Sequence, residues 1–346
     1  MDMKHFPKTI DTGAYKSGHI QGIAIDPVKG YVYCSYTQLL VKLDLQGNLI
    51  GSCEGLTGHL GCIDFNDEDG KVYGSLEYKN DSIGRGIRKF LGDTETEVET
   101  SFFIAVFDVD KIDRPHMDAC TDGVMKTVYL KEVVKDYNES GENGAPHRYG
   151  CSGIDGTTFG PKFGQTDGKR YLTVAYGIYG DVNRADNDRQ VLLQYDVTQW
   201  DNLLKPLSQS NFHKSGPEVP DGKYFLFTGN TEWGVQNLEY DEGAKKWLLC
   251  VYRGKKPHNP NYPLFTVDAA SPVEVNCAGE QELSLSADGI LHEPSGIRGW
   301  NFPRGAEGIY AFGNGYYYVS HPDKLEDGRR TAILHLYNET DLKQLS

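Results

Sequence analysis

The most restrictive feature of this sequence is a short apolar segment that recurs five times. Each copy is followed by a turn rich in Asp, Asn or Gly, and then by a second and a third β-rich run. Because Gly permits the positive φ of tight hairpins, each copy predicts a β-hairpin with a further strand beside it. The copies align on Ile23, Ile63, Ile154, Leu238 and Ile309. Such a repeat constrains the fold more strongly than composition does.

A fourth run follows in four copies: NLIGSC, VMKTVYLKEV, KYFLFTG and QELSLS. The last copy lacks one, and the orphan strand at 5–12 can pair there and close a ring without exposed sheet edges. Over the whole chain this pattern resembles five-bladed β-propellers. We therefore expect an all-β, single-domain propeller over 1–346 with four-stranded blades, a β-sandwich with accidental repeats being the alternative. The blades are expected at 19–55, 59–133, 150–229, 234–286 and 305–341.

Net charge and the length of the apolar runs limit the classes of partner that the chain can bind. The chain has 35 Lys and Arg against 49 Asp and Glu, a net charge of −14. Nucleic-acid binding relies on clustered Lys and Arg, so no nucleic acid is expected. No apolar run approaches ~20 residues, so no membrane partner is expected. Seven cysteines without a Cys-x-x-Cys pair favour a cytoplasmic location, with secretion open if a signal peptide was removed. The oligomeric state stays open.

The repeat also predicts where a site lies. In a propeller blade the first strand is nearest the axis, and its start meets the end of the second strand on one face. Long insertions gather there, and long loops are more often functional than idle. These insertions span 80–100, 136–150, 180–189, 254–262 and 287–305.

Polar residues at the first-strand starts predict chemistry near the axis. Amides and a carboxylate buried there cost several kcal/mol unless channel water or a cation satisfies them. Oxygen ligands suit Ca²⁺ or Mg²⁺, whereas the equivalent His19 and His59 with Glu307 suit Zn²⁺, Mn²⁺ or Fe²⁺. The candidate metal ligands are Gln21, Gln236, Asn237 and Glu307.

The second-strand ends and the loop before blade three supply candidate substrate-binding residues. Arg pairs with carboxylate or phosphate through two hydrogen bonds, and aromatic side chains stack on sugars or bases. The alternative is that each Arg pairs with an acidic neighbour and each aromatic covers the core. The candidates are Glu77, Arg148, Tyr149, Tyr179, Arg253 and His321.

These residues favour a hydrolase or lyase that acts on a small anionic or sugar-like molecule, in which His19, His59 and Glu307 are catalytic and a divalent cation assists. The AEG at 306–308 and the QN at 236–237 are similar to the axial metal site of calcium-dependent lactonases and phosphotriesterases, which have six blades. That resemblance implies a cation held by Glu307 and Asn237.

Two other functions stay open. Five-bladed glycosidases that resemble arabinanases place three carboxylates around the axis, and here Glu77, Asp155 and Glu307 are candidates. A non-catalytic binding or scaffold propeller would also explain why no GxSxG, Walker A or HExxH motif occurs. The segment DVNRADNDRQ at 181–190 lacks the register of a calcium loop and is interpreted as a polar turn.

Overall fold

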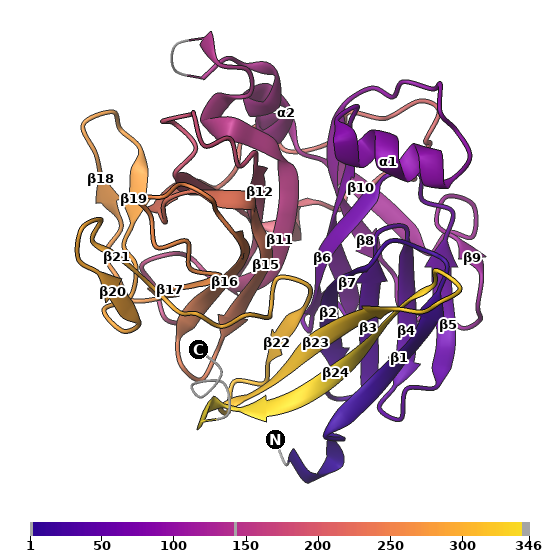
Figure 1. Ribbon diagram of the computed structural model, residues 1–346. Helices are drawn as coiled ribbons and strands as arrows, with labels where there is room; N and C mark the ends of the chain where they lie inside the picture. The colour runs from indigo at the N-terminus through magenta and orange to yellow at the C-terminus, as the bar shows by residue number, and fades with distance from the viewer. Residues whose placement is uncertain (1–2, 142–143, 341–346) are drawn as a thin grey trace.

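Five small sheets form a ring in the computed structural model, which describes residues 3–141 and 144–340 (Figure 1). The fold is the five-bladed β-propeller that the repeats predict. The first strands of the blades are β2 (Ile20–Asp26), β6 (His59–Asn66), β11 (Cys151–Pro161), β15 (Thr231–Asp241) and β22 (Ile309–Ala311). Each contacts the next in this order, and β22 contacts β2, so these strands surround one axis.

The outer strands follow the predicted order in the first three blades. Blade one adds β3 (Tyr31–Tyr36), β4 (Leu39–Asp44), β5 (Leu49–Glu54) and the short β9 (Met117–Asp118), which is parallel to β5. Blade two adds β7 (Lys71–Tyr78), β8 (Ser101–Phe107) and β10 (Met125–Tyr129). Blade three adds β12 (Arg170–Ile178), β13 (Arg189–Tyr195) and β14 (Gly222–Phe227).

The N-terminal strand completes blade five. This blade contains β22, β23 (Tyr316–Lys324) and β24 (Arg330–Asn338), and β1 (Thr9–Tyr15) pairs with β24 in antiparallel fashion. Thr9 lies opposite His335, and the buried Thr12 hydroxyl donates to the Ala332 carbonyl at 2.9 Å. The two ends of the described chain therefore share one sheet.

The expectation of four strands in every blade holds for blades two and five but is wrong for the other three: blade one has five strands, blade three has six and blade four has three. That blade has only β15, β16 (Lys246–Arg253) and β17 (Leu264–Asp268). The expected fourth run becomes β19 (Gln281–Leu283), which pairs in parallel with β14 of blade three and, with β18 (Glu274–Val275), extends that sheet to six strands.

Contacts of Arg189 hold the run at 281–286 beside blade three, and isolated backbone hydrogen bonds replace a fourth strand in blade four. Arg189 in β13 contacts Glu280 at 2.7 Å and Glu282 at 2.9 Å, which holds the run against blade three. At the outer edge of blade four, single residues bond to β17: the Trp300 amide donates to the Leu264 carbonyl at 2.9 Å, and the Ser286 amide donates to the Thr266 carbonyl at 2.8 Å. Trp300 follows the hairpin of β20 (Ile290–His292) and β21 (Ile297–Gly299).

The repeated turn is built as the sequence predicts. In the β2–β3 turn the Asp26 carboxylate accepts from the amides of Val28 and Lys29, and Gly30 takes a φ of 71°. The corresponding Gly70 in blade two has a φ of 70°. Glycine is suited to this left-handed conformation, so the turn residues recur with the strands.

Aromatic and aliphatic side chains fill the spaces between blades, with Trp247, Tyr176 and Phe159 among the largest that are fully buried. All seven cysteines are free, and five of them are buried: Cys34, Cys53, Cys62, Cys151 and Cys250. Buried free thiols are what the apolar runs around them predict.

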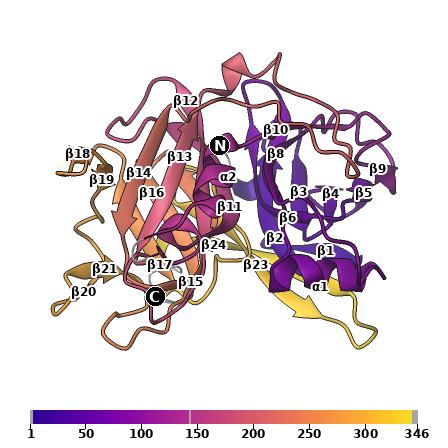
Figure 2. The same ribbon diagram turned by 90° about the horizontal axis from the view of Figure 1, so that it is seen from above.

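Two helices lie in the insertions. Helix α1 (Ser82–Phe90) connects β7 to β8, and α2 (Lys131–Asn138) precedes β11. Asp81 caps α1 by accepting from the Gly84 amide at 2.9 Å. Figure 2 shows α1 on the same side of the ring as the β23–β24 hairpin. Within 3–141 and 144–340, no helix is both long and apolar enough to span a membrane.

Candidate active site

A cavity of about 470 Å³ opens where the first strands begin, and we call it the mouth cavity. The starts of β2, β6, β11 and β15 contribute its polar residues, and α1 lies along it. The tip of the β23–β24 hairpin, from Lys324 to Arg330, also borders it. The insertion at 80–100, expected to be functional, therefore supplies a helix that covers the cavity.

One group of ionisable residues in the cavity, the His59 cluster, consists of His59, Glu77, Lys79 and Asp155. The Lys79 ammonium lies 2.6 Å from the Glu77 carboxylate, and both side chains are 4% exposed. Nδ1 of His59 lies 3.5 Å from the same Glu77 oxygen. A buried charge is costly without a partner, so the three groups stabilise one another.

Burial changes the acid–base properties of this cluster. It raises the pKa of Asp155 from 3.8 to about 7, although the charge of His59 opposes the shift. Burial alone would lower the pKa of His59, but its contact with Glu77 and the charge of Asp155 raise it overall. The cluster therefore holds a carboxylic acid that titrates near neutrality beside an imidazole whose pKa is raised.

A second group in and beside the cavity, the His19 cluster, consists of His19, Tyr252 and Glu307. The Tyr252 hydroxyl donates to Glu307 at 3.2 Å and lies 3.4 Å from Nε2 of His19. Burial, with added repulsion from His59 and Arg330, lowers the pKa of His19 to about 4. Burial also raises the pKa of Glu307. His19 is therefore neutral at pH 7 and is able to accept a proton.

The predicted metal ligands make protein contacts in this structure. Asn237 is buried, and its amide nitrogen donates to the carbonyls of Gln21 and Ala306 at 2.8 and 2.9 Å. Gln21 donates to Thr37, and Gln236 donates to the carbonyl of Trp233. Among residues 3–141 and 144–340, no three His, Cys, Asp or Glu side chains are grouped to hold a metal ion. A bound cation stays a prediction.

The predicted substrate-binding residues are dispersed. Glu77 belongs to the His59 cluster, whereas Arg148 and Tyr149 border a separate cavity of about 450 Å³. Arg148 is paired with Asp136 and Glu139, which agrees with the alternative that each Arg pairs with an acidic neighbour.

The other three predicted substrate-binding residues, Tyr179, Arg253 and His321, contact protein groups away from the His59 cluster. Tyr179 packs edge-to-face on Trp233. Arg253 donates to Asn261 and Asn301, and His321 stacks on His335 at 4.0 Å. None of these three borders the mouth cavity as the described residues define it.

Sequence reasoning did not select Lys79, Tyr252 or Trp233. Glu77 near the end of β7 and Lys79 just after that strand were a usable signal, because two charges this close to a buried apolar run must pair. Nothing in the sequence indicated the position of Trp233. Its left-handed φ of 67° costs ~1–3 kcal/mol for a bulky residue, so local preference would not predict it.

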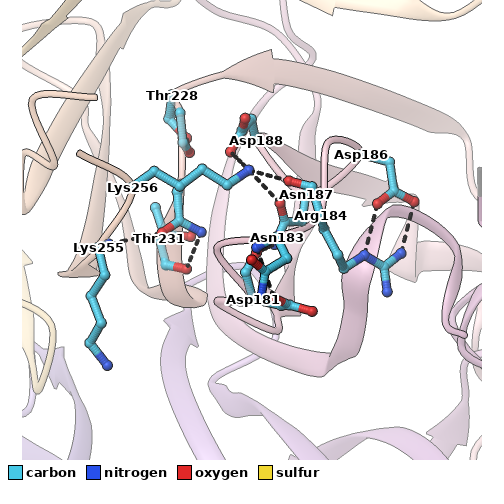
Figure 3. A network of polar contacts seen from close by, with 12 residues as sticks. Asp181, Asn183, Arg184, Asp186, Asn187, Asp188, Thr228, Thr231, Lys255 and Lys256 are labelled. Atoms are coloured by element: carbon cyan, nitrogen blue, oxygen red, sulfur yellow. Dashed lines mark hydrogen bonds and ion pairs between the residues drawn. The ribbon is translucent and has the colours of Figure 1, made fainter. Parts of the chain in front are cut away.

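The polar segment at 181–190 is a turn held by a lysine (Figure 3). The buried ammonium of Lys256 donates to Asn187 at 2.9 Å and Asp188 at 2.7 Å, and also to the Arg184 carbonyl. Asn187 in turn donates to the carbonyls of Tyr179 and Asp181. Two of the side-chain oxygens that resemble a calcium loop in sequence, those of Asn187 and Asp188, thus bind an ammonium group.

Together the ring and its mouth cavity define a five-bladed β-propeller with ionisable groups at one end of the axis. No known family model matches the chain, and no curated protein is significantly similar to it.

Proposed function

We propose that the mouth cavity is the active site of a hydrolase or lyase that applies general acid–base catalysis to a small anionic or hydroxylated molecule. One observation supports this most: the two histidines of one cavity have pKa values displaced in opposite directions. Burial lowers that of His19 to about 4, whereas contacts with Glu77 and Asp155 raise that of His59. Active sites separate acid and base roles in this way.

The arrangement suggests a role for each group. Neutral His19 takes a proton from the substrate or from water, and its Nε2 stays within reach of the Tyr252 hydroxyl. His59, whose pKa is raised, or Asp155 with its pKa near 7, gives a proton to the leaving group. Glu77 and Lys79 are positioning residues that hold His59, and Glu307 holds Tyr252.

A substrate panel with two histidine variants tests this proposal. Proton NMR would follow sugar acids, their lactones and sugar phosphates with wild type, His19→Gln and His59→Gln. Each variant should lose about 10²-fold or more in turnover, the usual contribution of a general acid or base. His116→Gln is the matched control, because that side chain is 82% exposed and lies outside the cavity. Equal turnover by all four proteins would contradict the proposal, and ligand binding without turnover would favour a non-catalytic binding propeller.

Glycoside hydrolysis is the second candidate, because Asp155 and Glu77 border the same cavity. A glycosidase needs a protonated carboxyl group as acid and an ionised one as base or nucleophile. Asp155 titrates near pH 7, and Glu77 is ion-paired with Lys79. Asp155→Asn should then slow hydrolysis of alkyl arabinosides far more than that of p-nitrophenyl arabinosides, whose leaving group needs no acid. Equal loss on both substrates would count against this role.

A further inference from the structure

Trp233 has a backbone conformation that nothing in its own strand requires. Its φ is 67°, and the next residue, Gly234, has a φ of 74°. The ladder between β15 and β16 is irregular between Glu232 and Val235, so Trp233 lies in a bulge. A positive φ is a genuine outlier for a bulky side chain. The bulge places this tryptophan on the mouth cavity.

The surrounding structure holds the bulge on both sides, as a strained conformation requires. Before it, Gln190 donates to the hydroxyls of Thr231 and Thr228 at 3.1 and 2.8 Å, near the network of Figure 3. Lys255 pairs with Glu232 at 2.8 Å. After it, a Cβ on Gly234 would lie 2.4 Å from the Tyr176 carbonyl, so only glycine fits there.

The cavity that Trp233 borders has aromatic and aliphatic side chains among its polar ones. The Tyr179 ring meets the indole edge-to-face, with centroids 5.7 Å apart. The Tyr179 hydroxyl donates to Asp81, the residue that caps α1, at 3.1 Å. Helix α1 then borders the cavity with Ile83, Ile87 and Phe90. These side chains offer no hydrogen bonds, so the part of the cavity that they line suits a flat apolar ring.

The β23–β24 hairpin brings two cations to the same cavity. They are Lys324 and Arg330, and no carboxylate of the described chain lies within ion-pair distance of either. The charge of Arg330 reaches the active-site groups, because it contributes to lowering the pKa of His19. The charge of Arg330 also acts on Glu307, but neither cation is held in an ion pair with a described carboxylate, so in a chain of net charge −14 the two suit an anionic group.

We propose that the molecule bound in the mouth cavity is an aryl anion: its flat apolar ring stacks on Trp233 beneath α1, and its anionic group binds Arg330 and Lys324. This inference rests on the proposed function, because it takes the mouth cavity as the place of reaction. It narrows the substrate class from anionic or hydroxylated molecules to aromatic ones.

Calorimetric titration with three probes tests the two halves of the ligand. The probes are 2-naphthoate, its neutral analogue 2-naphthamide, and D-glucuronate, which is anionic without an aromatic ring. Wild type should bind 2-naphthoate about 10-fold or more tightly than either of the others. Trp233→Gly should weaken 2-naphthoate by about 10-fold, the scale of one stacking contact. Arg330→Gln should weaken 2-naphthoate but leave 2-naphthamide unchanged.

Lys245→Gly is the matched control for Trp233→Gly. Lys245 also has a positive φ, 53°, but it lies in the β15–β16 turn away from the cavity. Both variants relieve the backbone and should keep or raise the melting temperature, whereas only Trp233→Gly should lose affinity. Unchanged 2-naphthoate affinity in a folded Trp233→Gly protein, or equal affinity of wild type for 2-naphthoate and D-glucuronate, would overturn the inference.

The outcome separates this inference from the proposed function. If wild type turns over hydroxylated acids through His19 and His59 but does not bind 2-naphthoate, the inference fails and the proposed function stands. If 2-naphthoate binds through Trp233 and Arg330 and nothing is turned over, the inference stands and the acid–base role fails.

Discussion

Replacing Asp155 by Asn should change the pH dependence of stability, because this carboxyl group is buried with a raised pKa. The value is 3.8 for an ordinary Asp and about 7 in the folded protein. Between these values the unfolded chain has released the proton and the folded protein retains it. Stability contributed by Asp155 therefore falls as pH rises from about 4 to about 7. A difference of about three pH units, at ~1.4 kcal/mol each, amounts to ~4 kcal/mol.

Asparagine does not titrate, so the pH-dependent contribution of residue 155 disappears, while its hydrogen bond with the Cys62 amide can remain. Its side-chain oxygen still accepts from the Cys62 amide, which lies 3.1 Å from Oδ1 of Asp155. Relative to wild type, Asp155→Asn should therefore gain up to ~4 kcal/mol of stability between about pH 4 and pH 8. Urea denaturation across that range measures the difference.

His19 should show the opposite slope and provides an internal check. Its pKa falls from 6.5 to about 4 on folding, so its contribution to stability is lost as pH falls through this range. The wild-type curve alone is uninformative because the two terms offset each other. Asp201→Asn, the same substitution at an exposed position, is the matched control variant. A difference between wild type and Asp155→Asn that is the same at every pH would refute the buried-acid argument.

Three further outcomes follow from contacts in and near the mouth. Lys79→Met should destabilise the fold by ~3–5 kcal/mol, because it leaves Glu77 buried without its cation, and adding Glu77→Gln should restore much of the loss in urea denaturation. Elemental analysis of protein purified without a His tag tests the predicted cation: near-stoichiometric metal should be present in the wild type and lost in Glu307→Gln, since the two bonds of Asn237 to backbone carbonyls use its amide nitrogen and not the oxygen that would bind a cation, and no metal in the wild type would contradict the prediction. Lys256→Met should make 181–190 the first site of limited proteolysis, since that ammonium is bonded to three oxygens of the turn, and an unchanged digestion pattern would show that the turn holds without it.

The fold was predictable because the sequence signals that specify it lie within short segments and recur five times. A hairpin needs an alternating or apolar run, a glycine turn and a second run, and five such units in one phase have few ways to bury their faces. The fourth strand of blade four was the exception. The run at 281–286 has strand character, but Arg189, more than 90 positions earlier in the chain, pairs with Glu280 and Glu282 and draws it to blade three. Such a long-range ion pair has no local signal.

The candidate site was predictable in position but only partly in composition. His19, His59 and Glu77 were chosen because strand starts and ends meet on one face, and all three border the mouth cavity. Arg148 and Arg253 were chosen by the same rule, yet their side chains bond to neighbours elsewhere. The rule places a backbone position near the mouth, whereas side-chain direction depends on the partners that the fold brings within reach.

By itself the sequence determined the ring: its periodicity, its turns and the face on which polar strand starts gather. Only the tertiary structure decided the chemistry of that face. It lowers the pKa of His19 and raises that of His59, because the charges nearest to the ring differ between two equivalent buried positions. It also places Trp233 at the cavity. The bulge there, which neighbouring residues hold on both sides, has a φ that cannot be predicted from the residue type.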